Sequence, residues 1–146
     1  MKKVFCLFCT CILVSSCSAV KQKSFICESE YQESSTETVY YYNTDEEVQS
    51  VLIKLNQVFS DEIVAQRSRD EILDDLRDAF LSSVGADTQV EVKYDEKSKE
   101  ANVELSLNVE DMNDRELKYL NLDKTLNVKK LLKYLNSLGL NCKKVN

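Results

Sequence analysis

The chain of 146 residues contains no histidine, no tryptophan and no proline, and it has only two glycines. Histidine is the usual general base near neutral pH and the commonest metal ligand in proteins. Its absence excludes catalytic triads of the Ser-His-Asp and Cys-His types. Phosphate loops and dinucleotide-binding fingerprints need several glycines close together. Because Gly85 and Gly139 lie far apart, the sequence carries neither motif.

Charge is unevenly distributed along this acidic chain, which has 25 acidic and 19 basic residues. Residues 28–114 hold 23 acids and 7 bases, whereas residues 115–146 hold 8 bases and 2 acids. A general nucleic-acid-binding protein shows a basic patch over its domain, so the acidic balance argues against that class. Two interpretations of the basic C-terminal part stay open. It lies against the acidic remainder, or it forms a basic face for anionic lipid or an acidic partner.

The first residues follow the order of a secretory signal peptide. Lys2 and Lys3 precede an uncharged apolar run from Val4 to Val14, and small residues follow it. The run has eleven residues, whereas a membrane-spanning helix needs about 20. The pattern therefore predicts export and removal of this segment, rather than a permanent transmembrane helix.

The end of the run, Val14-Ser15-Ser16-Cys17, resembles the lipobox of bacterial lipoproteins. Val14 stands where that family most often has leucine. The resemblance implies a signal peptide at 1–16, cleavage before Cys17, a diacylglyceryl thioether on its sulfur and acylation of the new N-terminus. Ser18 in the next position implies sorting to the outer membrane. The alternative is an ordinary signal peptide that is cleaved after Ala19, so that Cys17 is lost.

Cysteine number predicts a disulfide bond in the exported chain. Either cleavage leaves Cys27 and Cys142 as a pair of thiols and removes the three cysteines of the apolar run. An even number of cysteines in an exported chain favours a disulfide. The alternative is that these thiols stay free or pair with another chain. Two cysteines 115 positions apart do not make a zinc pattern, and we predict no metal site, no cofactor and no catalytic residues.

Alternating apolar residues predict a β-hairpin with strands at 88–94 and 101–109. The apolar positions have even numbers in the first strand and odd numbers in the second. They lie on the same face of the hairpin only if the two residue numbers of each cross-strand pair have an odd sum. A sum of 197 places Lys93 opposite Glu104 and avoids facing like charges. Segment 38–42 has the composition of a further strand. Tyr40 and Tyr42 share one face of it and are a candidate binding surface, the alternative being a half-buried edge strand.

Helical spacing of apolar residues predicts three helices, at 45–59, 69–83 and 128–138. Capping boxes that begin at Thr44 and Ser68 favour the first two starts. The last helix has Asn127 before it and Gly139 after it, which are a typical N-cap and a typical left-handed stop.

The polar face of the last helix carries three lysines: Lys129, Lys130 and Lys133. They are a second candidate binding surface, for anionic phospholipid. The alternative is an ordinary solvated face of an amphipathic helix.

These elements predict one α+β domain at 37–146, with a small antiparallel sheet covered by helices. Residues 17–36 are polar and predict a lipidated cysteine followed by a flexible tether. We expect a binding or structural module of the bacterial envelope, held at the membrane by its N-terminal lipid and with a protein partner there. One alternative is a secreted soluble effector or inhibitor. Another is a carboxylate-based hydrolase, although no partner residue singles out a pair among the 25 acids.

Overall fold

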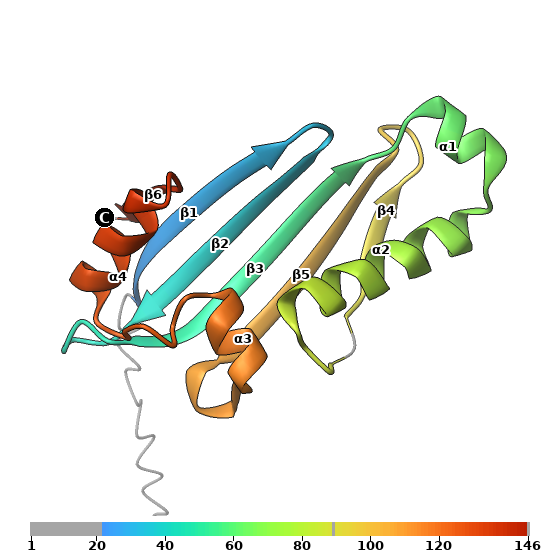
Figure 1. Ribbon diagram of the computed structural model, residues 1–146. Coiled ribbons are helices and arrows are strands. Elements are labelled where there is room, and N and C mark those ends of the chain that lie inside the picture. The colour runs from blue at the N-terminus through green and yellow to red at the C-terminus, as the bar shows by residue number, and fades with distance from the viewer. Residues whose placement is uncertain (1–21, 89, 146) are drawn as a thin grey trace, which may run out of the picture.

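The computed structural model describes residues 22–88 and 90–145, so the predicted lipobox and Cys17 lie outside the described residues. Within this range the chain forms an α+β fold with a six-stranded antiparallel sheet (Figure 1). The strand order is β4-β5-β3-β2-β1-β6. The strands are β1 (Lys23–Tyr31), β2 (Ser34–Tyr42), β3 (Val48–Val58), β4 (Val92–Asp95), β5 (Glu100–Asn108) and β6 (Asn141–Val145). The sheet is thus larger than the small hairpin-based sheet that the sequence predicts.

Four α-helices and one short 3-10 helix accompany the sheet in the described residues. They are α1 (Asp61–Gln66), α2 (Arg69–Val84), α3 (Asp114–Tyr119), α4 (Val128–Ser137) and the 3-10 helix η1 (Val109–Asp111). In Figure 1, α2 lies along β4 and β5, whereas α4 lies beside β1 and β6 at the opposite edge of the sheet. One core joins these layers, with Phe25 and Ile53 from the sheet packed in the same cluster as Phe80 and Leu131 from the helices.

Two of the three predicted helices are confirmed, together with their ends. α2 begins at a capping box in which Ser68 N donates to Glu71 Oε2 at 3.0 Å, and it ends at Gly85 with φ of +78°. α4 begins at Asn127, whose Oδ1 accepts from Lys130 N at 3.2 Å. Because each cap is local, short sequence patterns are enough to predict it.

The predicted helix at 45–59 is wrong, because most of this segment is β3. A bulge between the Tyr41 and Tyr42 pairings places Ser50 opposite the first and Val48 opposite the second. Val48 and Val51 are therefore both fully buried on the same face of the strand, although they are three residues apart. A strand with a bulge thus imitates helical spacing.

The predicted capping box at Thr44 is also absent. Asn43 Oδ1 instead accepts from the backbone N–H groups of Asp45 and Glu47, both at 3.0 Å. Glu46 between them has φ of +59°. This asparagine turn leads the chain back into β3.

The predicted flexible tether is wrong for the part that the structure describes, because 23–31 is β1 and 34–36 begins β2. Phe25 and Cys27 point into the core, Ile26 between them is half-buried on the other face, and the polar residues after them become exposed toward the end of the strand. This alternation is short, and the polar positions outnumber the apolar ones. The domain therefore begins by Lys23 rather than at 37, and the predicted strand at 38–42 is the second half of an interior strand.

The hairpin of β4 and β5 is confirmed, but its predicted register is wrong by two. Lys93 faces Asn102, a sum of 195 that keeps the required odd parity. The loop explains the shift, because Asp95 Oδ1 accepts from Lys97 N at 2.8 Å and Ser98 N at 3.0 Å. These bonds hold a four-residue turn and bring Asp95 opposite Glu100. β4 begins at Val92, so Glu91 does not pair with Glu104 in the ladder.

Candidate functional site

The predicted Cys27–Cys142 disulfide is present and joins the first strand of the domain to the last. β6, which the sequence analysis did not predict, pairs with β1 so that the two cysteines face each other with their Cα atoms 4.1 Å apart. In antiparallel sheets such a short separation is typical of a pair that exchanges no backbone hydrogen bonds. The disulfide therefore links the strands at a point where the ladder itself provides no bond.

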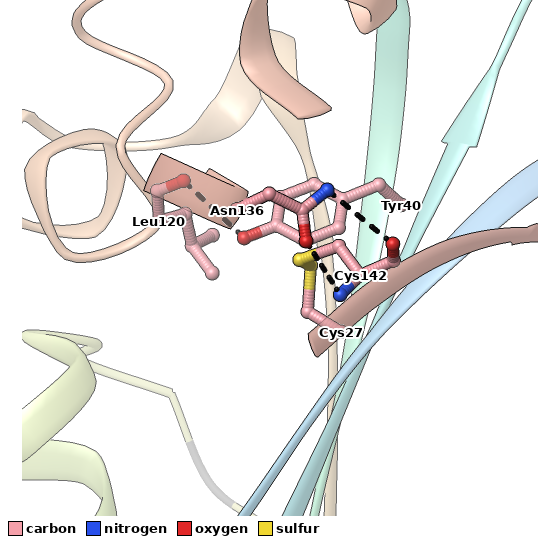
Figure 2. The surroundings of a disulfide bond; sticks show 5 residues. All are labelled: Cys27, Tyr40, Leu120, Asn136 and Cys142. Atoms are coloured by element: carbon pink, nitrogen blue, oxygen red, sulfur yellow. Dashed lines mark hydrogen bonds between the residues drawn. A yellow bond between two sulfur atoms is a disulfide. The ribbon is translucent and has the colours of Figure 1, made fainter. Parts of the chain in front are cut away.

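Asn136 of α4 bonds the outer side of this edge strand (Figure 2). Its Nδ2 donates to Cys142 O at 3.4 Å, and its Oδ1 accepts from Cys142 N at 3.1 Å. The unpaired N–H and C=O groups of an edge strand are a template for pairing with other chains. Here one side-chain amide occupies both groups of Cys142, so the helix blocks the sheet edge near the start of β6.

The candidate binding surface at Tyr40 and Tyr42 is wrong, because the face that these tyrosines share is the inner face of the sheet. Their exposed fractions are 3% and 7%. Tyr40 stacks on Phe25 with ring centroids 4.5 Å apart, and its hydroxyl donates to Leu120 O at 3.3 Å (Figure 2). Burial raises the pKa of Tyr40 well above its ordinary value, and the Tyr119 phenol adds to the rise. These tyrosines stabilise the core.

The three candidate lysines of α4 are exposed, because Val128, Leu131 and Leu135 turn the opposite side of the helix into the core. Lys129 Nζ lies 3.0 Å from Glu46 Oε2. Among the described residues, Lys130 and Lys133 form no ion pair.

Pairing of β6 with β1 brings further lysines to the sheet edge beside α4. Lys144 Nζ lies 3.7 Å from Glu46 Oε1 and 5.7 Å from the ring centroid of Tyr42. Lys129 and Lys144 thus share one carboxylate, and the hydrogen bond from Lys129 is the main reason why the pKa of Glu46 is lowered. Lys143 Nζ lies 3.0 Å from Glu28 Oε2.

We call this surface the lysine edge and define it by six residues: Lys23, Lys129, Lys130, Lys133, Lys143 and Lys144. Lys23 belongs to it because it lines the same shallow hollow as Lys144, Glu46 and Val145. Sequence spacing indicated the three lysines of α4. It did not indicate the others, because nothing local in the sequence predicts that β6 returns to β1. Glu46 and Asn136 were missed for the same reason.

The described part of the chain contains no group of three or more acidic, cysteine or histidine residues that could hold a metal ion. None of its helices is both long and apolar enough to cross a bilayer. Its one buried carboxylate, Glu116, accepts from Asn113 N at 2.7 Å in the capping box of α3.

Comparison with known proteins defines a fold class and no more. No protein-family model matches the sequence, and no curated protein sequence is significantly similar to it. The fold is similar to that of the Escherichia coli YehR protein, solved by NMR, with a TM-score of 0.60, 13% identity, and coverage of 86% of this chain and 94% of that chain. An NMR structure of a protein from Streptococcus pneumoniae TIGR4 aligns with a TM-score of 0.49, 14% identity and coverage of 98% and 96%.

Proposed function

We propose that the mature chain is a lipoprotein of the bacterial envelope that acts as a binding or structural module. The observation that carries the proposal is the lipobox-like Val14-Ser15-Ser16-Cys17 directly before the folded domain. The disulfide between Cys27 and Cys142 supports it, because such bonds form and persist in oxidising compartments outside the cytosol. Ser18 favours the outer membrane as the place of anchoring.

The position of β1 sets how far the domain can lie from the proposed lipid anchor. Because β1 begins at Lys23, only six residue steps separate the lipidated Cys17 from the domain. Six steps of fully extended chain reach at most about 20 Å. The lipid therefore holds the domain close to the headgroups, rather than at the end of a long tether.

A binding or structural role is also supported by the chemistry of the core. A hydrolase that works through carboxylates needs two of them facing the substrate. The buried carboxylate Glu116 is engaged with the backbone of Asn113 instead. What the domain does offer is a surface of exposed ammonium groups beside a disulfide-linked sheet edge.

Metabolic labelling with a radioactive fatty acid tests the proposal. We expect label in the wild-type protein, none in Cys17→Ser, and unchanged labelling in the control Cys11→Ser, whose cysteine lies inside the apolar run. Mass spectrometry of the non-reduced mature protein should show an acylated N-terminal cysteine and a Cys27–Cys142 bond. An unlabelled wild-type protein that begins after Ala19 and is found in the medium would overturn the proposal in favour of the secreted effector or inhibitor.

A further inference from the structure

We propose that the lysine edge lies against anionic phospholipid headgroups, so that α4 and β6 face the bilayer and α2 faces away from it. This inference rests on the proposed function, since the lipid on Cys17 is what brings the domain to the membrane. It adds the orientation of the domain and the chemical class of its ligand, an anionic lipid surface.

The chain enters the domain inside the lysine edge. Lys23 is the first residue of β1, and Ser24 faces Val145 in the antiparallel pairing with β6. Lys23, Lys144 and Val145 line one hollow. With a reach of about 20 Å from Cys17 to Lys23, the surface around this entry point is the part of the domain nearest to the headgroups.

Charge gives the domain two unlike sides. α4 and β6 carry five lysines and no acid, whereas α2 carries five acids, Asp70, Glu71, Asp74, Asp75 and Asp78, and two arginines. α2 packs on the same face of the sheet as α4, but over β4 and β5 at the opposite edge (Figure 1). An anionic bilayer attracts the first side and repels the second, so a single orientation is favoured.

The lysines differ in how far they are neutralised within the protein. Glu46 and Glu28 together pair with Lys129, Lys143 and Lys144. Lys130 and Lys133 have no such partner among the described residues, and both are exposed on α4. A lysine near an anionic bilayer strengthens binding by roughly fivefold. These two residues are therefore the main carriers of the attraction.

An exposed apolar side chain at the C-terminal end of each of the two elements suits the same ligand. Leu138 directly after α4 is 55% exposed, and Val145 at the end of β6 is 45% exposed. Apolar side chains beside lysines allow a surface to bind at the boundary of headgroups and acyl chains. An acidic protein is the other partner that the charge would fit, but the short connection to Cys17 favours the bilayer.

Vesicle sedimentation tests the inference on the non-lipidated chain from Ser18 onward, which contains every residue that the structure describes. We expect binding to phosphatidylcholine vesicles that contain phosphatidylglycerol, no binding to pure phosphatidylcholine vesicles, and weaker binding as salt is raised. Lys130→Glu with Lys133→Glu should weaken binding at least tenfold. The control pair Lys93→Glu with Lys97→Glu, in the β4–β5 hairpin, makes the same change of net charge and should alter binding less than twofold.

Equal losses in the two double variants would overturn the inference, because net charge alone would then explain the binding. Absence of binding to the anionic vesicles would overturn it as well. The inference would also fail if an acidic protein bound these lysines while the anionic vesicles did not. Circular dichroism of both variants checks that they are folded. The chain used for sedimentation has no Cys17, so its binding to vesicles does not depend on lipidation. A failure of the proposed lipidation appears only in the fatty-acid labelling, and a failure of this inference appears only in the sedimentation.

Discussion

The side-chain amide of Asn136 hydrogen-bonds both the N–H and the C=O of Cys142 on the side that faces away from β1. One residue of α4 thereby takes the place of a neighbouring strand at the edge of the sheet. The bonds join the last helix to the last strand beside the disulfide (Figure 2). The two interactions hold β6 on different sides: the disulfide links it to β1, and the Asn136 amide links it to α4.

Asn136→Ala should lower the free energy of unfolding by about 1–3 kcal/mol, since two hydrogen bonds of about 0.5–1.5 kcal/mol each are lost. Hydrogen exchange at the Cys142 amide should become faster by more than the global loss of stability explains. Urea denaturation and amide exchange measure the two effects. Ser137→Ala, at the next exposed position of α4, is the control and should leave the Cys142 amide unchanged. An unchanged exchange rate in Asn136→Ala would show that this bond does not form in solution.

Replacement of both Cys27 and Cys142 by alanine should lower the free energy of unfolding by about 2–4 kcal/mol. The bond spans 115 positions, and closing a loop of this size restricts the unfolded chain strongly, with about 4.7 kcal/mol as the value for a 100-residue loop in the entropic treatment. Urea denaturation of the oxidised wild type, the reduced wild type and the double variant measures this. The last two should agree. If the oxidised wild type is no more stable than the double variant, the disulfide does not stabilise the fold.

Tyr40→Phe should cost about 0.5–1.5 kcal/mol, because the hydroxyl bond to Leu120 O is lost while the stacking on Phe25 is kept. The pKa of Tyr40 is raised above its ordinary value by burial. Its contribution to stability is therefore complete below about pH 10 and is lost as the pH rises further, because the unfolded state ionises first.

An absorbance titration of the tyrosines measures this effect. Burial also raises the pKa of Tyr119, so the late component of the wild type should contain more than one phenol, and Tyr40→Phe should reduce its amplitude by one phenol. Tyr31→Phe, which removes a hydroxyl from a side chain that is 73% exposed, is the control and should leave the amplitude of the late component unchanged. A late component of undiminished amplitude in Tyr40→Phe would contradict the assignment.

Gly85→Ala and Gly139→Ala form a matched pair that separates backbone strain from crowding. Both glycines have positive φ, +78° and +87°, and a residue with a Cβ in this region costs roughly 1–2 kcal/mol. A Cβ on Gly85 would also lie 2.6 Å from the Cβ of Arg115, whereas a Cβ on Gly139 would meet nothing within 4 Å. Thermal or urea unfolding should therefore show a clearly larger loss for Gly85→Ala. Equal losses would mean that α3 can move away from Gly85 without cost.

Features that depend on neighbours in the sequence could be predicted, and features that depend on distant partners could not. The caps at Ser68 and Asn127 are local, and so are the stop at Gly85 and the alternation in β5. The bulge that gives β3 a helix-like spacing of apolar residues and the pairing of β6 with β1 depend on contacts between distant segments.

The candidate site follows the same division. Counting cysteines was enough to predict the pair Cys27 and Cys142. Helical spacing was enough to predict that Lys129, Lys130 and Lys133 share an exposed face. That Tyr40 and Tyr42 face inward could not be predicted. The strand has three successive tyrosines, so either of its faces is apolar enough to be buried. That Lys143 and Lys144 join the lysines of α4 depends on the β1–β6 pairing.

The Cys27–Cys142 bond makes a covalent ring of everything between the two cysteines. A protease that cuts any one peptide bond inside this ring, for example in the exposed turn at 96–98 between β4 and β5, releases no fragment. Both halves stay attached to the chain that leads to Cys17. In an anchored protein a nicked domain is therefore retained at the membrane, and only a second cut or reduction of the disulfide allows part of it to leave.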